Sequence, residues 1–115
     1  MKKSVLTIVL LATLIFTLVG CGGGVPANMD QETYNLGNDA LKIMEEYRND
    51  KMDADEAEER LTEIADKLQK VKPKEEYEVM NSSVHTEVFA ATVNIQQGDS
   101  VIDEIDSLKK TLELE

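Results

Sequence analysis

The stretch that decides the fold is residues 53–71, DADEAEERLTEIADKLQKV. Its apolar residues recur every three or four positions, at Ala57, Leu61, Ile64, Ala65, Leu68 and Val71. This spacing places them on one stripe of an α-helix, opposite a charged face. Asp53, with Glu56 three residues later, has the pattern of a capping box that starts such a helix. The stretch therefore predicts an amphipathic helix that buries its stripe against other helices.

The preceding segment predicts a first helix from near Asp30 to near Asn49, with Asp30 as its cap. Its apolar positions are Leu36, Ala40, Ile43, Met44 and Tyr47. Gly37 lies inside this pattern and costs about 1 kcal/mol relative to alanine in a helix interior. It predicts either a close contact with another helix or a late start of the first one.

A third helix is predicted after Pro73, which suits a first helical turn. One apolar face holds Tyr77, Met80, Val84, Val88, Ala91 and Ile95. A second apolar flank, Val79, Phe89 and Val93, predicts that this helix is the most buried of the bundle. The β-branched content leaves a strand over residues 84–95 as an alternative, although the three- and four-residue spacing favours a helix.

Gly98 and its neighbours predict a stop, followed by a fourth helix that Asp99 or Ser100 caps. The apolar face of this helix is Val101, Ile102, Ile105, Leu108 and Leu112. The alternative is one long third helix with a kink at Gly98. Because short connections favour antiparallel neighbours, residues 30–115 are predicted to form an all-α domain, a small antiparallel four-helix bundle with coiled-coil-like packing.

The N-terminus has the pattern of a secretory signal. Lys2 and Lys3 precede residues 5–19, which carry no charge and are dominated by aliphatic side chains and phenylalanine. As a helix this segment would rise only about 22 Å, which is less than a hydrocarbon core of about 30 Å. A cleaved signal is therefore favoured over a permanent transmembrane helix.

Leu18-Val19-Gly20-Cys21 resembles the lipobox of bacterial lipoproteins. The resemblance implies that signal peptidase II cuts between Gly20 and Cys21, and that the Cys21 sulfur carries a diacylglyceryl anchor with acyl chains such as palmitate. Cysteine suits this role because its thiolate is a nucleophile. The chain is then a lipid-anchored membrane protein on the extracytoplasmic face, or in the outer membrane if the source has one.

Three segments follow from this resemblance: a signal peptide at 1–20, the lipidated cysteine with a flexible tether at 21–29, and the bundle at 30–115. Gly22, Gly23 and Gly24 make the tether flexible. Its short reach keeps the bundle near the bilayer. Lipidation also uses the only cysteine, which removes disulfides and cysteine-based metal sites from the mature domain.

The charge balance limits the partners. Without Lys2 and Lys3 the mature chain holds 10 basic and 23 acidic residues, a net charge of −13. Nucleic acid is excluded as a partner, because its binding depends on basic residues that neutralise phosphates. Lys70, Lys72 and Lys74 form the one dense basic cluster, which the predicted topology puts at the membrane-proximal pole. They are expected either to meet anionic headgroups or to complement a helix dipole.

Catalytic and metal chemistry find little support in the sequence. Ser82 and His85 share a helical face, but no third group completes a triad. A calcium loop that begins at Asp53 would need glycine and glutamate where Glu58 and Ile64 stand. We expect no catalytic residue, no metal ligand and no cofactor, and the alternative is a weak calcium site without this motif at the distal acidic pole.

The expected function is that of a non-enzymatic helical module, interacting or structural, that contacts an envelope protein from the membrane surface. Such a module should expose an apolar patch, for which Phe89, Val79 and Tyr34 are candidates. The alternative is a lipoprotein that binds a small ligand in an apolar pocket inside the bundle. That alternative requires an enclosed cavity of several hundred Å³.

Overall fold

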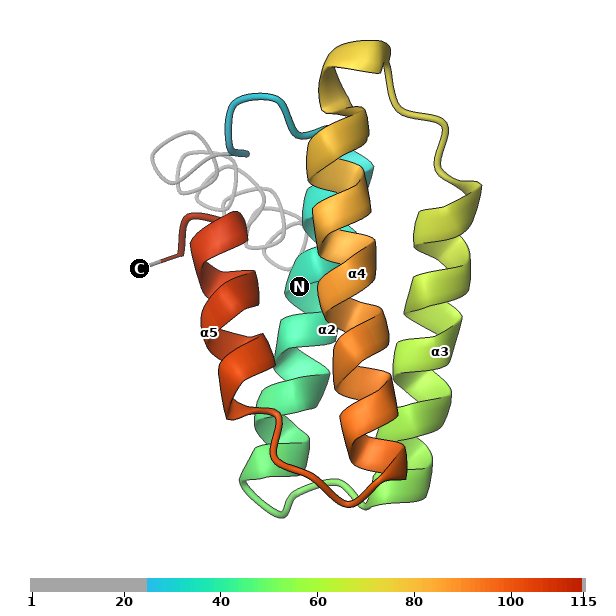
Figure 1. Ribbon diagram of the computed structural model, residues 1–115, viewed down its shortest axis with the longest axis vertical. Helices are drawn as coiled ribbons and strands as arrows, with labels where there is room; N and C mark the ends of the chain where they lie inside the picture. Colours follow the sequence, from blue (N-terminus) through green and yellow to red (C-terminus); the bar gives the residue numbers. More distant parts are fainter. Residues whose placement is uncertain (1–24, 115) are drawn as a thin grey trace, which may run out of the picture.

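The computed structural model describes residues 25–114, and within them all regular secondary structure is helical (Figure 1). The elements are α2 (Gln31–Arg48), α3 (Ala54–Lys70), the 3₁₀ helix η1 (Glu75–Tyr77), α4 (Glu78–Gln96) and α5 (Ile102–Thr111). The predicted all-α four-helix bundle is confirmed. The strand alternative is wrong, because residues 84–95 lie inside α4. The predicted signal peptide, the lipobox and Cys21 lie outside the described residues.

The starts of α2 and α3 follow the predicted caps. The Asp30 side chain accepts a hydrogen bond from the backbone amide of Thr33, and Asp53 Oδ1 accepts one from the amide of Glu56 at 2.8 Å. Each bond satisfies a donor that the first helical turn leaves without an intrahelical partner. Both predicted caps are therefore confirmed.

Left-handed residues end α2 and α4. Asp50 has φ 59° and Gly98 has φ 75°. Past each of them the chain closes the helix with a 2.8 Å backbone bond, from Lys51 N to Glu46 O and from Asp99 N to Asn94 O. These bonds have the pattern of a Schellman motif. Since the chain reverses at Gly98, α4 and α5 are separate helices, and the alternative of one long kinked helix is wrong.

The starts of α4 and α5 differ from prediction. Pro73 lies in the extended linker between α3 and η1 instead of opening α4. Asp99 and Ser100 precede the cap of α5, which is Val101. Ser100 Oγ still accepts a hydrogen bond from the backbone amide of Ile102 at 3.2 Å. The Val101 side chain is 2 % exposed, so the loop places this residue in the core before the helix begins.

Neighbouring helices run antiparallel around a shared core, with α4 in front of α2 and flanked by α3 and α5 (Figure 1). The core side chains come from all four helices and include Met44, Leu61, Leu68, Val84, Val88, Ile105, Leu108 and Leu112, each 1 % exposed or less. A Cβ atom on Gly37 would lie 2.9 Å from Leu112 Cδ2. Gly37 therefore marks the predicted close helix contact, between α2 and the end of α5.

Three residues of the predicted apolar faces are exposed to solvent, and two of them, Val79 and Phe89, are also the predicted candidates for an exposed patch. Val79 is 74 %, Phe89 58 % and Ile102 44 % exposed. The prediction that a second apolar flank makes this helix the most buried is wrong, because α4 meets the core through the opposite face, on which Val84 and Val88 lie.

The packed domain begins before residue 30. Pro26 is buried, Met29 is 4 % exposed, and the Met29 amide donates a 3.2 Å hydrogen bond to Pro26 O. The last residues of the predicted 21–29 tether, from Pro26 on, are therefore part of the packed bundle. Within residues 25–114, no helix has both the length and the apolar character that a bilayer span requires.

Candidate functional site

The outward face of α4 is distinguished by its large exposed apolar side chains. Val79 and Phe89 are its two large exposed apolar side chains. Between and beside them lie small or uncharged residues, Ser82, Thr86, Ala90, Val93, Gln96 and Gln97. A protein with a formal charge of −11 thus presents one helix face with a single carboxylate, that of Glu78 in the first turn of α4. Exposed apolar residues rimmed by polar ones are typical of protein interaction sites.

The sole acidic residue of α4 after its first turn, Glu87, points away from this face. Thr111 on α5 donates a 2.6 Å hydrogen bond from Oγ1 to Glu87 Oε1, and the second carboxyl oxygen is buried without a hydrogen-bond partner. Burial raises the pKa of Glu87, while the bond from Thr111 acts in the opposite direction. Glu87 therefore belongs to the α4–α5 contact.

The predicted patch is assembled only in part. Val79 and Phe89 lie on the same face of α4, whereas Tyr34 is half-buried on α2 and packs against the core. The spacing of apolar residues in the sequence does indicate this outward face of α4. Each residue advances a helix by about 100°, so Val79 lies about 180° around the helix from the buried Val88, and Phe89 about 140° from the buried Val84.

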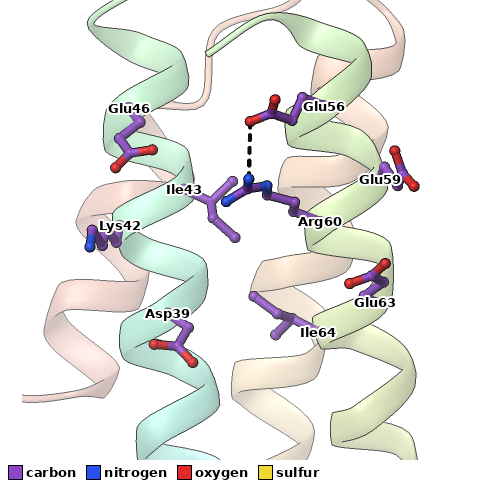
Figure 2. A pocket seen from close by; sticks show the side chains of 9 residues that line it. All are labelled: Asp39, Lys42, Ile43, Glu46, Glu56, Glu59, Arg60, Glu63 and Ile64. Atoms are coloured by element: carbon purple, nitrogen blue, oxygen red, sulfur yellow. Dashed lines mark ion pairs between the residues drawn. The ribbon is translucent and has the colours of Figure 1, made fainter. Parts of the chain in front are cut away.

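A second surface feature is the groove between α2 and α3, with a volume of about 690 Å³ (Figure 2). Its floor is formed by Ile43 and Ile64, which are 8 % and 7 % exposed. Its walls hold five carboxylates and two cationic side chains, namely Asp39, Glu46, Glu56, Glu59, Glu63, Lys42 and Arg60. The groove is an open, charged surface channel, which differs from the apolar interior pocket that the ligand-binding alternative requires.

One ion pair crosses a single helical turn in this groove. Arg60 Nη2 lies 3.4 Å from Glu56 Oε2, and both side chains are about half exposed. Such pairs contribute little to stability, about 0–1 kcal/mol, because water screens them. The remaining carboxylates make the groove a surface that repels anions.

The predicted basic turn lies at the pole where the bundle begins. Lys70, Lys72 and Lys74 are all exposed, and Figure 1 shows their loop at the same end of the bundle as the segment that precedes α2. Glu75 and Glu76 follow directly in η1. The pole thus combines both signs of charge, which weakens its attraction to an anionic surface.

The residues considered for catalysis and metal binding do not come together in the part of the chain that the structure describes. Ser82 is exposed, His85 is half-buried, and no hydrogen bond joins their side chains in the described structure. At the distal pole, Asp50, Asp53 and Asp99 line an open hollow of about 570 Å³ between the two loops. Among residues 25–114, no three histidine, cysteine, aspartate or glutamate side chains form a group that could hold a metal ion.

Comparison with known proteins adds no relative: no family model, no curated protein and no solved structure matches this chain. A bundle with one helix face that exposes apolar side chains and carries little charge is suited to binding another surface.

Proposed function

We propose that this protein is a membrane-anchored, non-enzymatic interaction module of the cell envelope that binds its partner through the outward face of α4. The observation that carries the proposal is the exposure of Val79 and Phe89 on a face where Glu78 is the one carboxylate. Burying these two side chains against a partner would remove apolar surface from water, at about 25 cal/mol per Å².

The rest of the bundle supports this choice of surface. The exposed sides of α2 and α3 carry the acidic residues of the groove. A partner on those sides would have to displace water from many carboxylates, which is costly unless each one gains a cation. On the outward face of α4 the partner meets one carboxylate, Glu78, so this desolvation cost is smaller.

The anchor is part of the proposal. Lipid on Cys21 would hold the chain to the extracytoplasmic face of the membrane, because two acyl chains bind a bilayer stably. Since the chain is already packed at Pro26, only about four residues would separate the lipidated cysteine from the bundle. The pole with Lys70, Lys72 and Lys74 would then face the membrane, and α4 would begin next to this pole.

Chemical crosslinking of the full-length chain in its native membranes tests the function. The expected result is one reproducible crosslinked partner, lost when Val79 and Phe89 are both changed to glutamate. Thr62→Glu is the matched control, because Thr62 is exposed on α3 and its replacement should leave the partner bound. A partner that survives the α4 double variant would contradict the proposal, as would the recovery of none.

A further inference from the structure

The charge of the bundle is distributed unevenly along its length. Its distal end consists of residues 45–60 and 96–106, which include the α2–α3 and α4–α5 loops at the lower end of Figure 1. This end holds 12 acidic and 3 basic residues, a net charge of −9. The opposite, proximal end consists of residues 25–34, 65–80 and 107–114 and holds 7 acidic and 6 basic residues, a net charge of −1. Most of the negative charge therefore lies at the distal end.

The carboxylates of the distal end lie at the surface. None of the 12 acidic side chains is buried, and eight of them are exposed. Among residues 25–114, a single ion pair, between Arg60 and Glu56 at 3.4 Å, joins a carboxylate of this end to a cationic side chain. The distal end therefore presents a negative charge that the protein itself compensates only in small part.

A lipid anchor at a single point fixes where a domain meets the bilayer, whereas the tilt of the domain depends on its interactions with the surface. Anionic lipids give a bilayer a negative surface potential, which falls off within a Debye length of about 8 Å at physiological salt. In an upright bundle, the 17 residues of α3 separate the two ends by about 25 Å, so the distal carboxylates lie beyond this potential. A bundle that lies on its side brings part of them into it.

We infer that the acidic distal end holds the bundle upright on an anionic membrane, because the surface repels this end and tolerates the nearly neutral proximal end. The inference rests on the proposed function, because it uses the anchor at Cys21 and names what keeps the outward face of α4 accessible. The axis of α4 follows the length of the bundle (Figure 1), so in the upright domain this face is turned toward neighbouring envelope proteins. In a bundle lying on this face, Val79 and Phe89 would meet lipid headgroups instead.

Energy transfer from a dye on the bundle to labelled lipid measures the tilt. The full-length chain is extracted from its native membranes with its anchor and reconstituted into phosphatidylcholine vesicles, with or without phosphatidylglycerol. Asn49→Cys carries the dye at an exposed position of the distal end, and Gln69→Cys carries it at an exposed position of the proximal end.

The upright bundle predicts that the distal dye lies farther from the lipid on anionic vesicles than on neutral ones, by about 10 Å or more and at most by the rise of α3, about 25 Å. The proximal dye should stay at the same distance on both. High salt should remove the difference at the distal dye, because it screens the surface potential.

Two variants separate the position of the charge from its amount. Each converts four exposed carboxylates, none of which makes a hydrogen bond in the described structure, into amides. The distal variant combines Asp55→Asn, Glu59→Gln, Asp103→Asn and Asp106→Asn, and the proximal control combines Glu32→Gln, Asp66→Asn, Glu75→Gln and Glu76→Gln. On anionic vesicles the distal variant should bring the distal dye closer to the lipid, and the proximal control should leave it at the parent distance. A cooperative thermal unfolding transition in each variant establishes that it is folded.

Three results would overturn the inference. A distal dye at the same distance on anionic and neutral vesicles would show that surface charge does not set the tilt, and would leave the proposed function standing, because crosslinking of the partner tests that function separately. An equal shift from both variants would assign the effect to the total charge instead of its position. A proximal dye that shows no transfer on either kind of vesicle would show that the chain is not anchored, which overturns the proposed function as well.

Discussion

Thr111 at the end of α5 donates a 2.6 Å hydrogen bond to Glu87 in the middle of α4, and this bond joins a short helix to the longest of the helices in residues 25–114. The carboxyl group is partly buried, and this burial raises its pKa above the ordinary value of 4.5. The folded state therefore holds the Glu87 proton more tightly than the unfolded chain does. Stability from this group is complete below pH 4.5 and is lost as the pH rises through the folded pKa.

Glu87→Gln should consequently raise the free energy of unfolding at pH 7, because the amide retains an acceptor for Thr111 and carries no charge to desolvate. At pH 4 the variant and the parent should be closer in stability. Urea unfolding at both pH values measures the difference. Glu59→Gln, at an exposed position on α3, is the control. An identical advantage of Glu87→Gln at pH 7 and pH 4 would show that charge at this position is irrelevant.

Gly37 and Leu112 should be energetically coupled. Alanine at position 37 would gain about 1 kcal/mol in helix propensity, but its Cβ would lie 2.9 Å from Leu112 Cδ2 and must displace that side chain. In the parent, Gly37→Ala should therefore give little or no gain. In a Leu112→Ala background it should stabilise the bundle by about 1 kcal/mol. A double-mutant cycle from thermal unfolding measures this, and simple additivity would rule out the contact as the reason for glycine.

The two left-handed helix ends make a matched pair of predictions. Asp50→Gly should stabilise the domain by about 0.5–1 kcal/mol, because glycine adopts φ 59° without steric cost. Gly98→Ala should destabilise it by about 1 kcal/mol through the backbone alone, since no atom lies within 4 Å of the added Cβ. Chemical unfolding of both variants tests the pair. Effects of the same sign would contradict the assignment of these two residues as left-handed caps.

The basic turn offers a test on membranes. Glu75 and Glu76 oppose Lys70, Lys72 and Lys74, so binding of the unlipidated mature chain to anionic vesicles should be weak and sensitive to salt. Changing Glu75 and Glu76 to lysine should strengthen it, by about 1 kcal/mol per added basic residue at the surface. Changing the three lysines to glutamate should abolish it. Binding that ignores the anionic lipid content or both sets of changes would show that this pole does not contact headgroups.

The sequence predicts α3 almost residue by residue, because the cap at Asp53 fixes where the helix begins and the apolar stripe fixes which side of it faces the core. Leu61, Ile64 and Leu68 are buried as the spacing requires. The caps at Asp30 and Asp53 and the stop at Gly98 follow from local chemistry, which acts within one turn. These features need no knowledge of the rest of the molecule.

The face of α4 is different, because its apolar residues lie on both sides of the helix. Periodicity alone does not say whether Val84 or Val79 turns toward the other helices, and tertiary packing decides in favour of Val84. The same limit applies to Ile102, which sits one residue after the buried Val101. The candidate site is therefore visible in the sequence as a set of residues, while its exposure is a property of the assembled bundle.

The intact mass of the protein extracted from its native membranes tests the central claim, anchoring through Cys21, most directly. The proposed function predicts a chain that begins at Cys21 and carries the added mass of a diacylglyceryl group, with Cys21→Ala accumulating as the uncut precursor. A chain that keeps residues 1–20, or one that begins at residue 21 with a free thiol, would contradict the membrane-anchored role.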